Sequence, residues 1–339
     1  FDPDGILNPN RIVRSPPLTE SLRFGTAYET VEVDTVFDFS DFGGLSRAAE
    51  QCGGVGTCRK TVAGTMCPSF MATREETAST RGRANALRLF ISGQMGPEGF
   101  TDPSLYPVLD LCFECKACKT ECPTGVDMAR IKSEFLHQHR RAHGVSLRSR
   151  VLANAEATAR WGSKLAPASN LLVNAPGLRQ LSAAFLGLEG ARKLPRFARQ
   201  TFLKWWERRG ETVGGAARGG RSDVAGFEGS GDSSAVLPAG SGSSGDPESA
   251  SSVGIFADTF TNYFEPRHGQ AAVRLAEKLG MEVVVPPRVC CGRPLISKGF
   301  LDQARRQAEL TAAVLFPLAE AGIPIVFCEP GCFLSLIHI

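Results

Sequence analysis

Four cysteines lie within eleven residues of this 339-residue chain, and the last of them precedes a proline. They form the pattern C-x2-C-x2-C-x3-C-P and are Cys112, Cys115, Cys118 and Cys122. Thiols at every third residue can surround one inorganic cluster from a single tight loop, as in bacterial ferredoxins. Zinc is the alternative, but structural zinc sites usually take two separated pairs of ligands. The pattern therefore predicts a [4Fe–4S] cluster.

An upstream segment supplies the partner that such a run requires, because the cysteine before the proline typically ligates a neighbouring cluster. This segment contains Cys52, Cys58 and Cys67, and Cys67 also precedes a proline. Exchanging the two pre-proline cysteines gives one cluster on Cys112, Cys115, Cys118 and Cys67, and leaves Cys52, Cys58 and Cys122. The second set is one thiolate short. A three-thiolate cluster with another ligand, a three-iron cluster and the absence of a second cluster therefore all stay open.

The remaining cysteines lie near the end of the chain and are Cys290, Cys291, Cys328 and Cys332. An adjacent pair is poorly suited to chelating one zinc ion, but it can present two thiolates to irons or to another redox group. Gly292, which follows the pair, permits close approach of the backbone. We expect these four residues to form a second redox or cluster site, with buried and inert structural thiols as the alternative.

Clustered cysteines in a chain of this size favour metal or redox chemistry in a reducing compartment over a disulfide framework. The net charge of +3 does not indicate a nucleic-acid partner. No apolar run is long enough to span a bilayer, and no secretory signal is recognisable. We expect a cytoplasmic protein, with peripheral contact with the inner membrane as an alternative. The start at Phe1 and the apolar end suggest a fragment.

Two helices are expected around the cysteine run. The first begins at Ser79 or Thr80 as N-cap and stops near Gly93, and the second begins after Asp127 and stops at Gly144. Further along, residues 252–331 alternate between strand and helix patterns, which favours a small α/β domain with a parallel sheet. Residues 210–252 are rich in Gly and Ser and too poor in apolar residues to fold, so a disordered linker is expected.

The fold class expected is therefore mainly α-helical with a small α/β domain. Residues 1–39 are turn-rich and resemble the tail of another domain. The other segments are a helical cluster domain (40–145), a basic helical spacer (146–209), the linker (210–252) and the sheet domain (253–339).

The motifs resemble those of a known family. The opening "FDPDGILNPN" is similar to the closing turns of FAD-linked oxidases, and "GTMCPSFMATREETASTRGRANALR" and "LDLCFECKACKTECPTGVDMARIK" resemble the α-helical ferredoxin region fused behind such a domain. The segments "VCCGRPLISKGFLDQAR" and "CEPGC" resemble the cysteine-rich CCG domain of glycolate oxidase iron–sulfur subunits.

The resemblance implies the electron-transfer part of an FAD- and [4Fe–4S]-dependent dehydrogenase of D-2-hydroxy acids, such as D-lactate or D-2-hydroxyglutarate. Such enzymes pass electrons to a quinone, a cytochrome or an electron-transfer protein. The alternative is a separate iron–sulfur subunit of a glycolate oxidase or glycerol-3-phosphate dehydrogenase. A zinc-stabilised interaction module is a third hypothesis, of a different class.

Two departures limit the resemblance. Only the last turns of a flavin domain are present, so no FAD-binding or catalytic residue is identifiable. The family also has a cysteine about thirty residues before the Cys290–Cys291 pair, where this chain has Asp258 and Thr259.

Three softer features have two interpretations each. The basic stretch 145–209, with its tryptophans, suits a membrane or partner surface, or is a spacer whose two adjacent tryptophans pack on the cluster domain. Three arginines lie near the cysteine run and are Arg81, Arg83 and Arg88. They could tune the reduction potential of the cluster, although a role as ordinary helix-surface residues is favoured. One helix carries His137, His139 and His143. The last two are four residues apart and could chelate a metal, but the flanking Arg140 and Arg141 favour surface positions, which we expect for these histidines.

Overall fold

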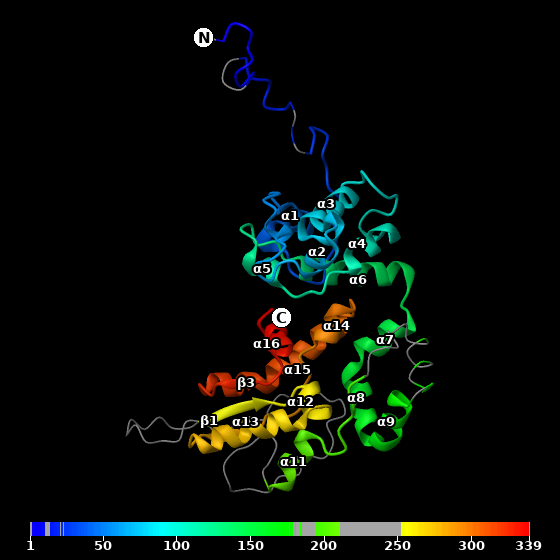
Figure 1. Cartoon of the computed structure of the whole chain (residues 1–339), viewed down its shortest axis with the longest axis vertical. Helices are drawn as coiled ribbons and strands as arrows, with labels where there is room; N and C mark the ends of the chain where they lie inside the picture. The colour runs from blue at the N-terminus through cyan, green and yellow to red at the C-terminus, as the bar shows by residue number, and fades with distance from the viewer. Residues whose placement is uncertain are drawn as a thin grey trace. The chain divides into compact units, whose positions relative to one another are not determined.

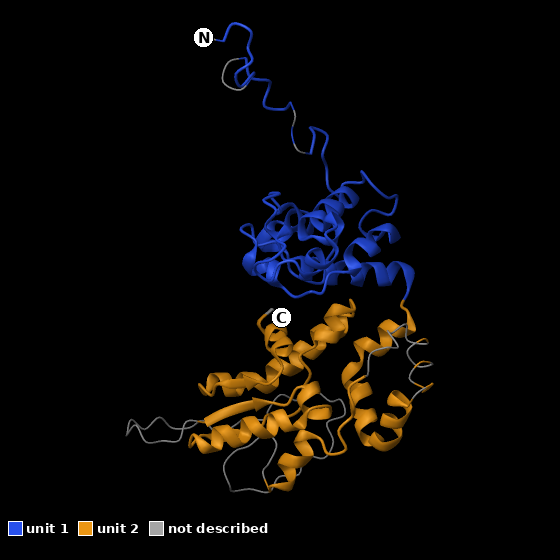
Figure 2. Cartoon of the chain, viewed as in Figure 1, with its two compact units in different colours: residues 1–144 blue, residues 145–339 orange. Residues whose placement is uncertain are grey.

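The computed structural model describes residues 2–10, 14–20, 22, 24–175, 177–178, 180, 184, 194–210 and 252–338. It divides into two compact units, residues 1–144 and residues 145–339 (Figure 2). Residues 211–251 of the expected linker lie outside the described residues. Each unit is considered by itself below.

The first unit is built from short helices joined by loops (Figure 1). The α-helices are α1 (Leu45–Glu50), α2 (Pro68–Thr73), α3 (Thr80–Ile91), α4 (Tyr106–Asp110), α5 (Ala117–Glu121) and α6 (Met128–His143). Single 3₁₀ turns occur at Ser40–Phe42, Thr57–Arg59, Glu76–Ala78, Gly99–Thr101 and Pro103–Leu105.

The two helices expected from the sequence are confirmed, and their caps explain where they begin. The Ser79 side chain accepts a hydrogen bond from the backbone N–H of Gly82, so Ser79 rather than Thr80 is the N-cap of α3. Asp127 accepts from the N–H of Arg130 in the same way at the start of α6. Each side chain satisfies one of the backbone donors that a helix leaves unpaired at its start.

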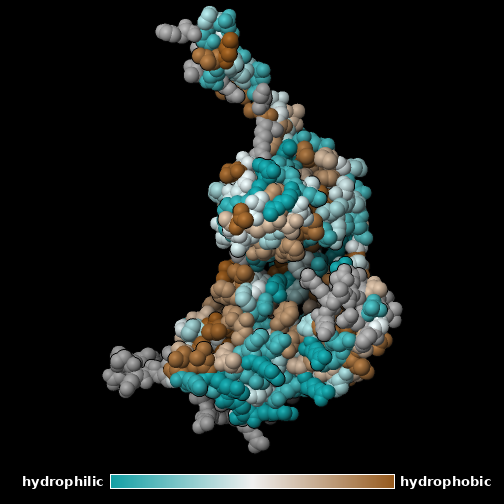
Figure 3. All heavy atoms as spheres, in the orientation of Figure 1, coloured by the Kyte–Doolittle hydropathy of each residue, from teal (hydrophilic) through white to brown (hydrophobic). Residues whose placement is uncertain are grey.

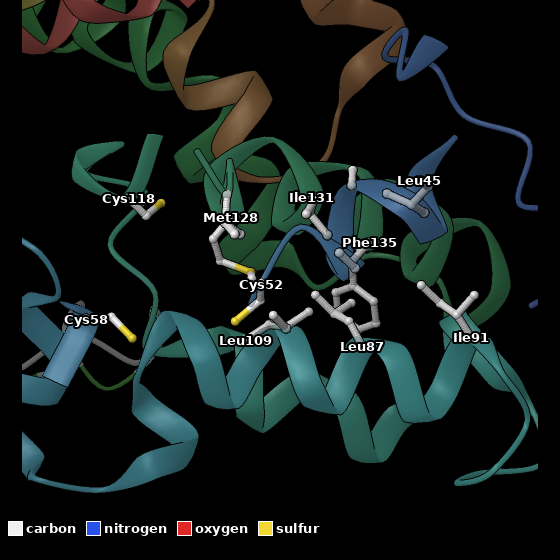
Figure 4. Packing of buried hydrophobic residues seen from close by; sticks show 14 of the residues in the cluster. Leu45, Cys52, Cys58, Leu87, Ile91, Leu109, Cys118, Met128, Ile131 and Phe135 are labelled. Carbon is white, nitrogen blue, oxygen red and sulfur yellow. The ribbon is translucent and has the colours of Figure 1, made fainter. Parts of the chain in front are cut away.

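The core of the first unit lies between α3 and α6. Leu87 of α3 and Ile131 and Phe135 of α6 have no exposed surface, and Figure 4 shows their side chains gathered between the helices. Burying such side chains stabilises the unit by about 1.5–3 kcal/mol each. Because the cysteine loops precede α3 and α6, this packing brings both loops to the same unit.

The segment before α1 is attached to this core by hydrogen bonds. The fully buried carboxylate of Glu134 on α6 accepts from the backbone N–H groups of Val36 and Phe37, both at 3.1 Å. The hydroxyl of Tyr28 donates to Glu50 of α1 at 2.6 Å. This segment therefore packs on the cluster-bearing unit.

The expectation that all three histidines of α6 lie at the surface is wrong for His137, which is 1% exposed. The ring of His139 lies 5.4 Å from that of Phe135 and 4.5 Å from that of His143. His143 is exposed, and its Nε2 lies 2.9 Å from the carbonyl oxygen of Thr101. The 3.6-residue helical period puts His137 on the core side.

The second unit combines helices with a small sheet. Its elements are α7 (Leu147–Ala153), α8 (Ala155–Lys164), α9 (Ala166–Asn174), α11 (Phe202–Arg208), β1 (Ser252–Phe256), α12 (Thr259–Tyr263), α13 (Pro266–Lys278), β2 (Glu282–Val284), α14 (Arg293–Ser297), α15 (Leu301–Glu320), β3 (Ile325–Phe327) and α16 (Pro330–His338).

The three strands run parallel in the order β2-β1-β3, which confirms the expected parallel sheet. Gly254 of β1 pairs with Val284 on one side and with Ile325 on the other. Helix α13 crosses from β1 to β2 and buries Val273 and Ala276. Its other face is charged, as the hydrophilic band of Figure 3 shows.

Helix α11 packs on the sheet of its own unit. Phe202 and Trp206 are buried together with Ile255 of β1 and Val273 of α13, and Trp205 packs against the same cluster. The interpretation that the two adjacent tryptophans pack on the cluster domain is therefore wrong. The sequence shows that α11 has an apolar face, but the identity of the surface that covers it depends on the tertiary structure.

None of the described helices is both long and apolar enough to cross a membrane. The longest of them, α15, carries charged residues along its length.

We predict that Trp206→Ala lowers the free energy of unfolding of the second unit by about 3–5 kcal/mol, because it leaves a cavity in the core. Trp161→Ala is the matched control, since Trp161 is 59% exposed, and it should cost less than about 1 kcal/mol. All three tryptophans of the chain lie in this unit, so their fluorescence during guanidinium denaturation measures the effect. Equal effects of the two substitutions would contradict the assignment of Trp206 to the core.

Candidate iron–sulfur centre

Four of the expected ligands line one pocket of the first unit. They are Cys67, Cys112, Cys115 and Cys118. Cys112 and Cys115 come from the loop between α4 and α5, and Cys118 from α5 itself, whereas Cys67 directly precedes α2. The two loops are separated by about forty residues of sequence, so the fold brings this set together.

Lys132 holds the loop that carries three of these cysteines. Its side chain is buried, and its ammonium donates to the carbonyl oxygens of Asp110 at 3.0 Å and Cys112 at 2.7 Å. The carboxylate of Glu114 lies 3.6 Å away. Glu114 and Lys116 have positive φ values of 52° and 63°, an uncommon conformation for residues with a side chain. The loop is thus tightly wound, and Lys132 attaches it to α6.

Cys67 is held by groups from α2 and α3. Its sulfur lies 3.3 Å from the hydroxyl of Ser69 and 3.6 Å from Nη1 of Arg83. Arg83 also donates to the hydroxyl of Ser69 and to the carbonyl oxygen of Val108, both at 3.0 Å. Burial alone would raise the pKa of the Cys67 thiol, but the Ser69 hydrogen bond and the Arg83 charge outweigh it, so the pKa is lowered.

Arg83 has no exposed surface. The interpretation of the three arginines as helix-surface residues is therefore wrong for Arg83, which touches a cysteine of the pocket. Arg88 is partly buried and lies over the ring of Phe24 at 4.4 Å. Both arginines belong to α3, so the helix alone does not tell which of them contacts a cysteine. The packing of the neighbouring loops decides it.

Three other cysteines line a second pocket of the same unit and are Cys52, Cys58 and Cys122. The backbone N–H of Arg81 points at the Cys58 sulfur, with a distance of 3.4 Å. The hydroxyl of Thr124 lies 3.3 Å from the Cys122 sulfur. No histidine, aspartate, glutamate or fourth cysteine is among the described residues that line this pocket.

The two pockets are neighbours, because Met66 and Thr80 line both. Gly82 makes the close packing around them feasible. A Cβ atom at this position would lie 2.0 Å from the carbonyl oxygen of Glu76, so only glycine lets α3 approach that turn.

The donor sets of both pockets fit a multi-iron cluster better than a single ion. Each consists mainly of thiols, the ligands that iron–sulfur clusters use. Within the ranges that the structure describes, no three His, Cys, Asp or Glu side chains are close enough to hold one metal ion.

Burial keeps some of these thiols protonated in the absence of a cluster. It raises the pKa of Cys118 to about 12, and it raises that of Cys112. Since thiolates are the ligands, assembly of a cluster must release these protons.

The cysteines of the second unit gather near the sheet. Cys291 and Cys332 are buried, and the Cys291 thiol forms hydrogen bonds with those of Cys290 and Cys332. The bond with Cys290 lowers the pKa of Cys291, but Cys332 and burial outweigh it and raise the pKa to about 12. The hydrogen bond with Cys291, together with burial, raises the pKa of Cys290.

Asp258 and Thr259 lie in the window where the resemblance expects a cysteine, and Asp258 has a structural role there. It is buried and caps α12, accepting from the N–H groups of Phe260 at 2.8 Å and Thr261 at 3.0 Å. Its charge and, more strongly, burial raise the pKa of the Cys328 thiol. A capping carboxylate therefore stands beside this cysteine.

Sequence reasoning missed Lys132 and Ser69 as residues of the site. A lysine in the middle of the otherwise apolar face of a helix was the available signal for Lys132. Ser69 lies two residues after Cys67, at the start of a helix, where serine is common for local reasons, so the sequence offered no signal.

Comparison with known proteins identifies the cofactor of the first unit. Residues 48–126 match the family model described as "4Fe-4S dicluster domain". This match confirms the predicted [4Fe–4S] cofactor.

Curated relatives extend the similarity beyond that domain. D-2-hydroxyglutarate dehydrogenase of Pseudomonas putida (strain KT2440) is 26% identical over 98% of this chain, and that of Escherichia coli (strain K12) is 24% identical over 98%. One subunit of the anaerobic glycerol-3-phosphate dehydrogenase of E. coli K12 is 25% identical over 56% of the chain and 40% of its own length.

The chain spans about a third of the length of both D-2-hydroxyglutarate dehydrogenases, 34% in each case. This agrees with the predicted resemblance to the iron–sulfur half of such enzymes. No solved structure matches the chain.

We predict that Lys132→Met lowers the free energy of unfolding of the first unit by about 2 kcal/mol or more, because two partly buried carbonyl oxygens lose a charged donor. Lys119→Met is the matched control, since the Lys119 side chain is 44% exposed, and its effect should stay within about 0.5 kcal/mol. Thermal unfolding followed by far-ultraviolet circular dichroism measures both. A Lys132→Met protein as stable as the control variant would refute the anchoring role.

Proposed function

We propose that this chain is the electron-transfer part of an FAD- and iron–sulfur-dependent dehydrogenase of D-2-hydroxy acids. The observation that carries the proposal is the pair of adjacent cysteine-lined pockets in the first unit, which share Met66 and Thr80 as walls. Neighbouring clusters provide a path for single electrons.

We propose that the first cluster is held by Cys67, Cys112, Cys115 and Cys118. The second is held by Cys52, Cys58 and Cys122, with its fourth position free of a protein thiolate. This assignment follows the lining of the two pockets and exchanges the pre-proline cysteines between the runs. When bound, each cluster supplies a one-electron carrier.

The residues of the chain hold and tune these carriers. The fold buries Cys67 and Cys118 and leaves Cys115 exposed, so an electron can leave through the thiol that reaches the surface. Backbone and side-chain N–H groups point at the sulfurs of Cys58 and Cys67. Such donors stabilise the reduced form of a cluster and raise its potential.

The substrate class follows from the relatives. Two proteins named D-2-hydroxyglutarate dehydrogenase match over 98% of the chain, including the flavin-domain-like opening. We therefore propose D-2-hydroxyglutarate or a similar acid as substrate and FAD, bound outside this chain segment, as the hydride acceptor. Electrons then pass to a quinone, a cytochrome or an electron-transfer protein. Location in the cytoplasm, with contact with the inner membrane surface, belongs to the same proposal.

A separate iron–sulfur subunit is the second candidate, and the match to a subunit of anaerobic glycerol-3-phosphate dehydrogenase favours it. That match covers 56% of the chain, whereas the D-2-hydroxyglutarate dehydrogenase match covers nearly all of it. Determining the coding sequence upstream of Phe1 distinguishes the two. A flavin-binding domain in the same reading frame supports the fused enzyme, and a start codon immediately before Phe1 supports the separate subunit.

We further propose that the cysteines of the second unit form a separate redox site; they are Cys290, Cys291, Cys328 and Cys332. The hydrogen-bonded contact from Cys290 through Cys291 to Cys332 supports a shared function.

We predict that Cys118→Ala and Cys58→Ala each remove one cluster and leave the other. A missing thiolate takes away a ligand that no nearby side chain replaces, so iron and acid-labile sulfide should fall by up to about four per chain in each variant. Quantitative iron and sulfide analysis of anaerobically purified protein measures the loss. Each variant is the control for the other. Loss of all iron in both, or of none in either, would contradict the assignment.

We predict that the double variant Cys58→Ala/Cys118→Ala retains the redox site of the second unit, which is detected either as bound iron or as thiols that oxidise reversibly. Adding Cys291→Ala should remove it, because Cys291 is in contact with both neighbouring thiols. Iron analysis and thiol titration under reducing and oxidising conditions measure this. If Cys291→Ala leaves both quantities unchanged apart from one thiol, the four cysteines are structural.

A further inference from the structure

Arg83 is a fully buried cation in the cluster-bearing unit. Burying a guanidinium is costly unless it is paired and hydrogen-bonded. Its hydrogen-bond partners are the carbonyl oxygen of Val108, the hydroxyl of Ser69 and the sulfur of Cys67. Among the residues that the structure describes, no carboxylate forms an ion pair with Arg83. Of these partners, the sulfur of Cys67 is the one that carries negative charge when it ligates a cluster as a thiolate.

Two other cations near the pockets, Arg81 and Lys132, lie beside carboxylates. Arg81 forms an ion pair with Glu76 at 2.7 Å, and its side chain is 25% exposed. Lys132 lies 3.6 Å from the carboxylate of Glu114. Both cations therefore exert a weaker net field on the nearby thiols than Arg83 does, because an adjacent carboxylate cancels part of their charge and water screens Arg81 further.

The position of Arg83 decides which pocket receives its field. Arg83 lines the pocket of Cys67, Cys112, Cys115 and Cys118, whereas Arg81 lines the other. Its guanidinium also ties Cys67 to Ser69 and, through Val108, to helix α4 just before the second cysteine loop. One side chain thus joins both loops that contribute ligands to the first cluster.

We propose that Arg83 positions Cys67 and raises the reduction potential of the cluster that Cys67 ligates. This inference rests on the proposed function. Reduction adds one electron to the cluster and makes the site more negative, so a buried cation without a carboxylate partner stabilises the reduced form more than the oxidised one. An N–H donor to a cluster sulfur acts in the same direction. The electron is therefore drawn toward the cluster beside Arg83.

The test is a redox titration of the full chain with clusters, monitored by electron paramagnetic resonance. In Arg83→Gln, the midpoint potential of one cluster should fall by at least about 59 mV. For a one-electron couple this is a tenfold decrease in the ratio of reduced to oxidised cluster. Arg83→Lys keeps the charge and should shift the potential less. Arg47→Gln removes one charge from an exposed side chain of the same unit and should shift neither cluster.

A second variant covers the case in which Arg83→Gln does not retain its iron. Ser69→Ala keeps the guanidinium but removes the hydroxyl next to the Cys67 sulfur, and it should lower the same midpoint by a smaller amount. The inference is overturned if wild-type spectra are intact and neither Arg83→Gln nor Ser69→Ala moves a midpoint. It is also overturned if Arg83→Lys and Arg83→Gln shift the potential equally. Wild-type protein without cluster signals would instead refute the proposed function.

Discussion

The burial of Leu87 against Ile131 and Phe135 is the contact on which the cluster-bearing unit depends. These residues join α3 to α6. Helix α6 begins just after the second cysteine loop, and α3 follows the first one after the short helix α2. Without this contact the loops would be independent segments about forty residues apart, and a ligand set drawn from both would not form. Hydrophobic packing between two ordinary amphipathic helices thus determines where the thiols meet.

Buried charges then fix the loops to that helical core. Lys132 reaches two carbonyl oxygens of the second cysteine loop, Glu134 accepts two backbone N–H groups of the segment before α1, and Arg83 holds Cys67 and Val108. Backbone in irregular loops needs such partners because it has no ladder of its own. The same residues place positive charge near the thiolates. Structural anchoring and electrostatic tuning therefore share side chains in this unit.

The second unit gathers its cysteines by a different route. Cys328 directly follows β3, Asp258 closely follows β1, and the Cys290–Cys291 pair follows β2. The carboxyl ends of parallel strands meet at one edge of a sheet, where sites of α/β folds are commonly found. The sheet topology thus brings together groups that the sequence spreads over about seventy residues. Asp258 both caps α12 and stands beside Cys328, which places a carboxylate next to this cysteine.

The sequence by itself determined the cofactor, the two long helices of the first unit, and the parallel sheet. Each of these follows from local information, namely thiol spacing, the capping residues Ser79 and Asp127, and alternating strand and helix patterns. Only the tertiary structure decided which cysteines share a pocket, and that Arg83 and His137 are buried while Arg88 lies partly exposed over an aromatic ring. It also decided that Trp206 packs on the sheet of its own unit. Those outcomes depend on which surfaces meet, because an apolar or charged helix face is compatible with several partners until the packing of the whole unit selects one.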